Sequence, residues 1–405
     1  MSCPFHFSRR AFLGGVAALA ATPSASAAIA ASAGDDPESS TEQATALPLE
    51  GEHQRGIVDP PQRYSVHCAL DFLPEVSLAE YFRALTQRTR ILVAGGPAAP
   101  DGIAFPATDS GELGLDIPTD NLTITVGVGA ALFDDRFGLS KLKTAHLVQM
   151  EPFADDSLVD SSCHGDIILQ ICADEKDTAL HALRDILRHT REFATTRWLQ
   201  NGYQNEPRPT GTQRNHLGFK DGIVNPHQDD FDSLVWAGHD EPAWAAGGSY
   251  MAVRLIGMLT EFWDRISIAE QEQICGRDRY TGGPLTGGDE WAAPDYTDDA
   301  VGDVIPTDAH IRLANPRTPD TADQLMLRRS YNYDNGLRRN GNIDAGLVFV
   351  AFQQDLKRQF ITVQKRLEGE PLADYLRPFG GGYFFMLPGL KDEYDYFGRL
   401  LLTQQ

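Results

Sequence analysis

The chain has 405 residues, of which 42% are hydrophobic and 23% charged, so it is long enough for a globular protein of two domains. Thirty-five basic residues stand against 57 acidic ones, which leaves a net charge of -22. This charge repels phosphate backbones and anionic membranes and argues against a protein that binds nucleic acid nonspecifically.

The first 27 residues have the pattern of an export signal. Arg9 and Arg10 precede an apolar, alanine-rich stretch at 14–21, and small residues suited to cleavage follow at 25–27. Paired arginines in this place predict twin-arginine export, and therefore a periplasmic, extracellular or cell-envelope location. The apolar stretch is shorter than the ~20 residues that a membrane-spanning helix needs, so we expect no integral membrane span.

Residues 28–48 are small, polar and acidic, a composition that predicts a disordered linker. Beyond the signal the chain contains four widely spaced cysteines, Cys68, Cys163, Cys172 and Cys275. Their spacing matches no zinc site. In an exported protein the four cysteines are compatible both with disulfide bonds and with buried free thiols, and the sequence does not decide between the two.

After the linker, the hydrophobic period switches between that of strands and that of helices. A helix is predicted from Ser77, which forms a capping box with Glu80. The other elements of this half are strands at 64–73, 122–128, 166–172 and 195–203 and a helix around 180–187.

The second half repeats this order. The predicted strands are at 249–256, 325–333, 345–353 and 382–388, and the predicted helices are at 261–274 and 355–368. The order β-α-β-β-α-β therefore occurs twice, which predicts an α+β fold of two ferredoxin-like domains, at 49–210 and 211–405. We expect antiparallel sheets with helices packed on them, of the dimeric α+β barrel type.

Two short stretches contain candidate functional residues. "GFKDGIVNP" (218–226) places Asp221 in a tight loop, where an acid is by itself most often a solvated turn residue or a cap. "TDAHIRLANPR" (307–317) contains His310 with no second ligand three or four residues away, so it lacks the pattern of a divalent-metal site. Haem needs only one protein ligand, because the porphyrin supplies four nitrogens.

Several segments together resemble the dye-decolorizing peroxidases, and within that family the exported deferrochelatase/peroxidase branch associated with ferrous-iron uptake. The similar segments follow one another along nearly the whole chain after the signal: "GEHQRGI" (51–57), "FDDRFGL" (133–139), "HGDIILQICA" (164–173), "GFKDGIVNP" (218–226), "GRDRYTGGPL" (276–285), "DAHIRLANPR" (308–317), "LMLRRSYNYDNG" (325–336), "GLVFVAFQ" (346–353) and "GGGYFFMLPG" (380–389).

The resemblance implies one b-type haem per chain, with His310 as the proximal ligand of its iron. It places Asp221 and Arg328 on the distal side as catalytic residues. A carboxylate there moves a proton between the two oxygens of hydrogen peroxide, and an arginine stabilises the negative charge that develops as the bond breaks. Without the resemblance, Arg328 would be interpreted as a solvent-facing cation.

Four further residues are expected at the cofactor on the same ground. Asp374 is the candidate carboxylate behind His310, and Phe349 is a further cofactor contact. Arg312 either binds a haem propionate, as Arg317 also could, or forms a surface ion pair. Asn225 either orients the neighbouring acid or only forms its turn. The chain departs from some relatives in having Ser330 where they have an asparagine that joins the distal hydrogen bonds.

The leading hypothesis is a haem peroxidase that reduces hydrogen peroxide and oxidises an organic reductant, dye-like or phenolic. One alternative is a deferrochelatase that releases iron from haem and leaves the porphyrin intact, and another is a non-catalytic haem carrier. A homodimer and an association with an iron-uptake system are open expectations. A surface aromatic residue is expected to relay electrons from bulky reductants, and no choice is made among Trp198, Trp236, Trp244, Trp263 and Trp291.

Overall fold

The computed structural model describes residues 48–98, 103–104 and 106–404. The predicted signal peptide (1–27) and all of the predicted linker (28–48) except its last residue lie outside the described residues.

The helices and strands of the first half follow the predicted order. They are β1 (Tyr64–Phe72), α1 (Leu78–Ala94), β2 (Gly96–Pro97), β3 (Asp116–Ile117), β4 (Thr123–Gly129), β5 (Ile167–Ala173), α2 (Lys176–Thr190) and β6 (Ala194–Tyr203). Helix α1 begins as expected because the side chain of Ser77 accepts a hydrogen bond from the backbone N–H of Glu80, at 3.3 Å. The short pair β2–β3 was not predicted.

The second half also follows the predicted order, with two of its helices broken. Its elements are α3 (Phe231–Leu234), β7 (Ser249–Met258), α4 (Thr260–Trp263), α5 (Ile268–Cys275), α6 (His310–Ala314), β8 (Leu327–Arg328), β9 (Tyr331–Leu337), β10 (Ile343–Gln353), the π-helical turn η7 (Lys357–Ile361), α7 (Thr362–Arg366), β11 (Leu376–Met386) and α8 (Arg399–Leu402). The single helix expected at 261–274 was wrong, because Ser267 caps a new helix by accepting a hydrogen bond from Glu270 N–H at 3.2 Å.

The large sheet joins the two halves. Its strand order is β4-β5-β1-β6 in the first half and β11-β7-β10-β9 in the second, which is the same ferredoxin-like order twice. Strand β11 pairs with β4, and β6 pairs with β9 at Tyr203 and Asn332, so the strands close into a ring. The short β8 adds to β10 beside β9. The predicted α+β fold with two ferredoxin-like units of the barrel type is confirmed.

Alternate side chains of each strand point into the ring and form its core. On β7, Val253 and Leu255 pack inward, while Arg254 and Ile256 point outward. The inward cluster draws on both halves: Ile57, Ala69, Ile168, Cys172, Trp198, Leu234, Val235, Trp236, Met251, Val253, Leu255, Tyr331, Tyr333, Val348, Val350, Phe352, Phe384 and Met386.

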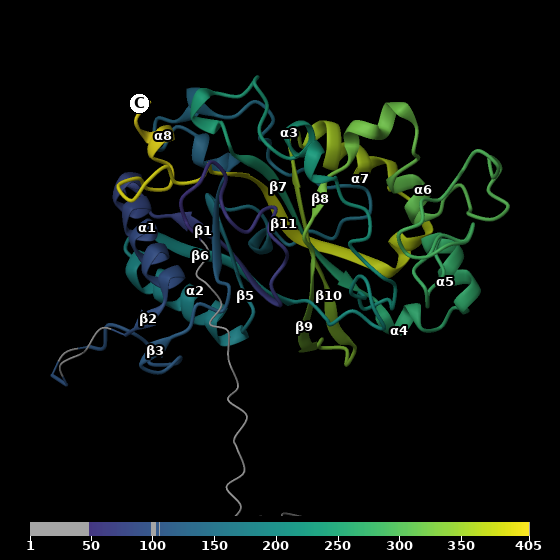
Figure 1. Cartoon of the computed structure of the whole chain (residues 1–405), viewed down its shortest axis with the longest axis horizontal. Helices are drawn as coiled ribbons and strands as arrows, with labels where there is room; N and C mark the ends of the chain where they lie inside the picture. Colours follow the sequence, from purple (N-terminus) through teal and green to yellow (C-terminus); the bar gives the residue numbers. More distant parts are fainter. Residues whose placement is uncertain (1–47, 99–102, 105, 405) are drawn as a thin grey trace, which may run out of the picture. The chain divides into compact units, whose positions relative to one another are not determined.

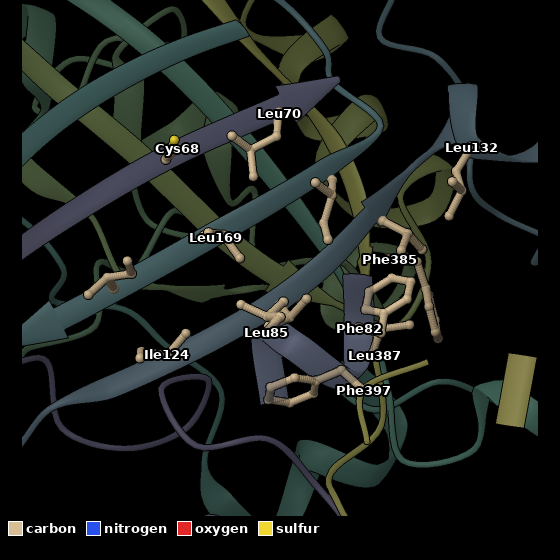
Figure 2. Close-up of a cluster of buried hydrophobic side chains, with 14 of the residues drawn as sticks. Cys68, Leu70, Phe82, Leu85, Ile124, Leu132, Leu169, Phe385, Leu387 and Phe397 are labelled. Carbon is tan, nitrogen blue, oxygen red and sulfur yellow. The ribbon is translucent and has the colours of Figure 1, made fainter. Parts of the chain in front are cut away.

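Helices cover the outward faces of the strands. In the first half α1 and α2 lie against the sheet, and the space between is filled by apolar side chains such as Phe82, Leu85, Ile124 and Leu169 (Figures 1 and 2). In the second half α5, α6 and α7 lie on the other side of the ring (Figure 1), and η7 runs directly into α7. Between these elements and the sheet is a cavity.

Cys68, Cys163, Cys172 and Cys275 are free thiols, and all four are buried. Burial raises the pKa of Cys68 to about 12, so this thiol stays protonated and unreactive at neutral pH. In the part of the chain that the structure describes, no helix is both long and apolar enough to cross a membrane.

Candidate active site

The cavity of the second half has a volume of about 290 Å³. One wall is the outward face of the sheet, and the facing wall comes from α6, η7 and α7. Its apolar lining is Leu217, Phe219, Ile223, Val224, Ile256, Met258, Pro294, Ile311, Ala314, Leu325, Met326, Leu347, Phe349, Phe360, Val363, Leu367, Leu372, Leu376 and Pro378. Its charged lining is Lys220, Asp221, Arg254, Arg277, His310, Arg317, Arg328 and Glu370. A mostly apolar cavity with a few converging charged groups is typical of a small-molecule or cofactor site.

His310 is the first residue of α6, and its ring is fixed by a carboxylate. Its Nδ1 lies 2.8 Å from Oε2 and 3.1 Å from Oε1 of Glu370, which is itself buried. Because a carboxylate only accepts, Nδ1 is the nitrogen that donates, which leaves Nε2 free as a ligand. Burial alone lowers the pKa of His310, but the charge and hydrogen bond of Glu370 outweigh burial and raise the pKa above its ordinary value of 6.5.

The prediction of Asp374 as the carboxylate behind His310 was wrong. Glu370 precedes Pro371, at the start of the 3₁₀ turn η8 (Pro371–Tyr375), and points to the imidazole. Asp374 lies at the far end of this turn and is exposed. The two acids lie four residues apart in the same segment, and the sequence signal that separates them is that Glu370 directly precedes a proline, as a residue before a helical turn often does.

The loop that contains Asp221 is held in place by several contacts. Gly218 and Gly222 adopt φ values of +87° and +82°, which only glycine adopts readily. The backbone N–H of Asp221 donates to the carbonyl of Gln213 at 3.0 Å. Next to it, Lys220 forms a buried ion pair with Glu290 at 2.9 Å. The carboxylate itself is held within the loop, because its Oδ1 accepts a hydrogen bond from the backbone N–H of Gly222 at 2.7 Å.

Asp221 and Arg328 form a loose pair in the cavity. Nη1 of Arg328 lies 3.6 Å from Oδ1 of Asp221, and their side chains are 26% and 20% exposed. Nη2 of Arg328 donates to the carbonyl of Val224 at 3.1 Å, which orients the guanidinium. The separation exceeds a hydrogen bond, so both groups keep bonding capacity for a small molecule between them. The solvent-facing alternative for Arg328 does not hold, since its side chain lines the cavity.

Asn225 lies beside the site without lining the cavity. Its Oδ1 accepts from the backbone N–H of Arg328 at 2.9 Å, and its Nδ2 donates to the carbonyl of the same residue at 3.3 Å. Asn225 thus ties the Asp221 loop to β8, and the expectation that it contacts a cofactor or orients Asp221 directly is not met.

Arg312 also points away from the cavity. Its guanidinium donates to the carbonyls of Ile305 and Asp299, both at 2.8 Å, and lies over the ring of Tyr296 at 4.9 Å. Arg312 follows His310 by two residues in α6, and two residues of a helix correspond to a rotation of about 200°. The side chains of His310 and Arg312 therefore point in different directions. The propionate role expected for Arg312 is therefore wrong. The alternative was a surface ion pair, and Arg312 does pair with Asp299 at 3.4 Å, but both side chains are mostly buried.

Besides Arg328, three arginines line the cavity. Arg254 is held in a buried ion pair with Asp156, and the other two are Arg277 and Arg317. Arg277 is buried, and its Nη1 donates to the carbonyls of Gly282 and Glu290 at 2.6 and 3.2 Å. Arg317 has a φ of +58°, a strained value for a residue other than glycine and one that is common at functional sites. The sequence pattern offered Arg317 as a candidate and gave no signal for Arg277.

Phe349 lies in the sheet wall of the cavity, where it was expected. It pairs with Arg254 across β10 and β7, and its ring centre lies 5.7 Å from that of Phe360 on the facing wall. Among the described residues, no group of three or more His, Cys, Asp or Glu side chains is placed to hold a metal ion.

Comparison with known proteins places the chain in a family. The N-terminal model of the Dyp-type peroxidases matches residues 54–204, and the C-terminal model matches residues 212–391. The chain therefore belongs to the Dyp-type peroxidase family, and it is an enzyme.

Individual relatives agree with this assignment. The chain is 50% identical over 368 residues to the deferrochelatase of Escherichia coli (strain K12), an alignment that covers 88% of this chain and 87% of that protein. The crystal structure of a DyP-type peroxidase from Cellulomonas bogoriensis is similar with a TM-score of 0.80 and 36% identity, over 88% of this chain and 98% of that one. Ferric DtpA from Streptomyces lividans gives a TM-score of 0.79 and 34% identity, over 88% and 97%.

Proposed function

We propose that the chain is a haem peroxidase that binds one b-type haem in the cavity, reduces hydrogen peroxide and oxidises an organic reductant, dye-like or phenolic. The observation that carries this proposal is that one cavity contains both a histidine fixed by a carboxylate and a separate acid–arginine pair. The ferric state named for the similar Streptomyces lividans protein supports an iron cofactor.

The residues of the cavity fit haem by their chemistry. The free Nε2 of His310 suits an iron that already has four porphyrin nitrogens. The apolar side chains of the two walls suit the porphyrin ring, and Phe349 is one of them. Arg277 and Arg317 would bind the propionates, because planar guanidinium groups pair well with carboxylates.

The cavity's own side chains supply the acid–base chemistry. Bound haem would supply an iron with one open coordination position. Asp221 would take the proton of one peroxide oxygen and deliver it to the other, while the charge of Arg328 stabilises the oxygen that leaves. Glu370 accepts a hydrogen bond from Nδ1–H of His310, which makes the imidazole a more basic ligand.

The test is an absorption spectrum of the purified chain loaded with haem, before and after hydrogen peroxide. We expect a ferric spectrum with a histidine ligand that changes on mixing with peroxide and returns on addition of a phenol or a dye. A loaded protein whose spectrum ignores peroxide would contradict the proposal.

A second candidate function is release of iron from haem with the porphyrin intact. It is favoured by the 50% identity to a protein named deferrochelatase. Incubation of the loaded chain with a ferrous chelator, followed by separate measurement of iron and of metal-free porphyrin by fluorescence, distinguishes the two functions. Equal molar amounts of both products support iron release, and unchanged haem supports the peroxidase alone.

A non-catalytic haem carrier is disfavoured. A carrier has no use for a carboxylate and a guanidinium that are both turned into the cavity, where partial burial costs free energy. Membership of an enzyme family points the same way.

Export is part of the proposal. We infer that the twin-arginine signal carries the folded chain across the membrane, to the periplasm or the cell envelope. Arg9→Lys together with Arg10→Lys should retain the chain in the cytoplasm, and its undiminished appearance outside would contradict this route. The association with an iron-uptake system and the homodimer stay predictions, to be checked by co-purification and by sedimentation.

A further inference from the structure

Two methionines line the cavity, Met258 on β7 and Met326 just before β8. The side chain of Leu327, between Met326 and Arg328, packs with the interior of the strand ring. Side chains alternate along a strand, so Met326 and Arg328 point to the same side, into the cavity. The thioether of Met326 is thus a neighbour of the arginine assigned to peroxide.

The methionines differ in their surroundings. Met326 belongs to the same apolar cluster as Phe360 and Val363 of the facing wall, whereas Met258 belongs to the cluster that contains Trp263 and Leu372. Met251 and Met386 lie inside the ring and are 0% exposed. The fifth described methionine, Met150, is buried against Arg254, with Nη1 to Sδ at 3.5 Å.

We propose that Met326 is a site of modification by peroxide, converted to the sulfoxide when the reductant is exhausted. This inference rests on the proposed function, which brings hydrogen peroxide to Arg328 and Asp221. A lone pair of Sδ attacks one peroxide oxygen and the O–O bond breaks. The proton on the attacked oxygen passes to the departing oxygen, which leaves as water. Sulfur is oxidised by two electrons, and peroxide is reduced by two.

The modification has a structural consequence. Methionine sulfoxide is polar, and at this place it would lie among Phe360, Val363 and the other apolar residues between η7, α7 and the sheet. The helical wall of the cavity then loses apolar packing, and its hold on a bound cofactor weakens. Sulfoxide formation is reversible by reductases, so Met326 would act as a recoverable limit on turnover without reductant.

The test maps oxygen onto individual methionines. The haem-loaded chain is exposed to increasing equivalents of hydrogen peroxide without reductant, quenched with catalase, digested and analysed by peptide mass. The peptide with Met326 should gain one oxygen atom at a lower dose than the peptide with Met258, and before the peptides with Met251 and Met386. Met326→Leu should slow the peroxide-dependent loss of haem absorbance, whereas the matched Met258→Leu should not.

The outcomes separate the two proposals. If the spectrum of the loaded chain does not respond to peroxide, the proposed function fails and this inference fails with it. If the spectrum responds but Met326 gains oxygen no sooner than Met251 and Met386, only the modification site is overturned. The wild-type peptide map decides this even if a variant fails to fold.

Discussion

The two halves share one strand order, but the outward faces of their sheets differ in packing. In the first half, helices of 17 and 15 residues, α1 and α2, cover the strands, and apolar side chains fill the space beneath them (Figure 2). In the second half the covering helices are short, with 8 residues in α5 and 5 each in α6 and α7. Long amphipathic helices close a face, and short, interrupted ones leave a cavity.

The contrast extends to chemistry. Under α1 the cluster is built from apolar residues such as Leu85 and Phe397 (Figure 2). In the second half, His310 begins the short helix α6 and Glu370 directly precedes the turn η8, and both side chains line the cavity. Strand order alone therefore does not make a site. Helix starts of the second half supply His310 and Glu370, and a loop and β8 supply Asp221 and Arg328.

The largest expected effect comes from removing the proposed iron ligand, His310, from the cavity of the second half. His310→Ala should leave a folded chain that loses most bound haem, since no other imidazole lines the cavity within the described residues. Haem titration followed by absorbance, with circular dichroism for the fold, measures both. His227→Ala, at a side chain that is 76% exposed, is the matched control and should bind haem normally. Full haem occupancy in His310→Ala would remove that residue from the role.

Truncating one aromatic ring on each side tests the packing difference directly. Phe82 is 0% exposed in the filled half, and Phe82→Ala should lower the free energy of unfolding by ~3–5 kcal/mol. Phe349 borders the cavity and is only partly buried, so Phe349→Ala should cost the haem-free chain less. Urea unfolding of both haem-free variants gives the comparison, and equal losses would show that the second face is as tightly packed as the first.

The acid–arginine pair should affect reaction rather than binding. Asp221→Asn keeps the size of the side chain and removes the base, so haem should stay bound while the rate of reaction with peroxide falls by ~10²-fold. Arg328→Leu should slow the same step through loss of charge stabilisation. Stopped-flow absorbance measures the rate, and Asp229→Asn, at a side chain that is 89% exposed, serves as control. If Asp221→Asn and Arg328→Leu both react with peroxide at the wild-type rate, the loop at 218–226 has only a structural role.

The hydrophobic periodicity and the repeated order of strands and helices predicted most of the fold. Apolar runs predicted β1, β5 and β10 nearly to their ends, because most residues on both faces of these strands are buried. The closure of the ring had no local signal, since β6 and β9 meet at one residue pair. The cap at Ser267, which begins a new helix after a break, was also missed, although the similar cap at Ser77 was predicted.

The candidate site was predicted in part, and the misses have a common cause. Asp221, His310, Arg328 and Phe349 line one cavity, as the resemblance implied. Arg312 and Asp374 stand in the right segments but on the wrong side of a short helical turn. A one-residue difference in where such a turn begins rotates every later side chain by about 100°, and sequence does not fix turn starts that closely.

A pH series on Glu370→Gln sharpens the assignment of Glu370. The carboxylate of Glu370 raises the pKa of His310 in the folded chain. The pair therefore stabilises the haem-free fold fully at pH values below the pKa of the unfolded chain, about 6.5. This stabilisation is lost as the pH rises through the raised pKa of the folded chain. The wild type should therefore lose stability over a window above that value, and the glutamine variant should lose less. Urea midpoints on both sides of the window measure it. Asp374→Asn should behave as the wild type, and identical curves for the glutamine variant would contradict the pairing.

The smallest expected effect concerns the route of electrons from bulky reductants, which are too large for the cavity. Among the five tryptophans considered, Trp291 is 61% exposed, and the other four are at most 7% exposed. Trp291 follows Glu290, whose carbonyl accepts from Arg277 of the cavity at 3.2 Å, so a short path joins the two. Trp291→Phe should slow oxidation of a bulky dye and leave that of a small phenol unchanged, as steady-state rates would show. Tyr394 is 80% exposed and lies two residues after Asp392, whose carbonyl accepts a hydrogen bond from Arg90 of α1 in the first half. Tyr394→Phe is the control and should change neither the rate with the dye nor the rate with the phenol. If the dye is oxidised by Trp291→Phe at the wild-type rate, electrons from the dye enter the cavity through another residue, and exposure next to a residue that contacts the cavity does not identify the relay.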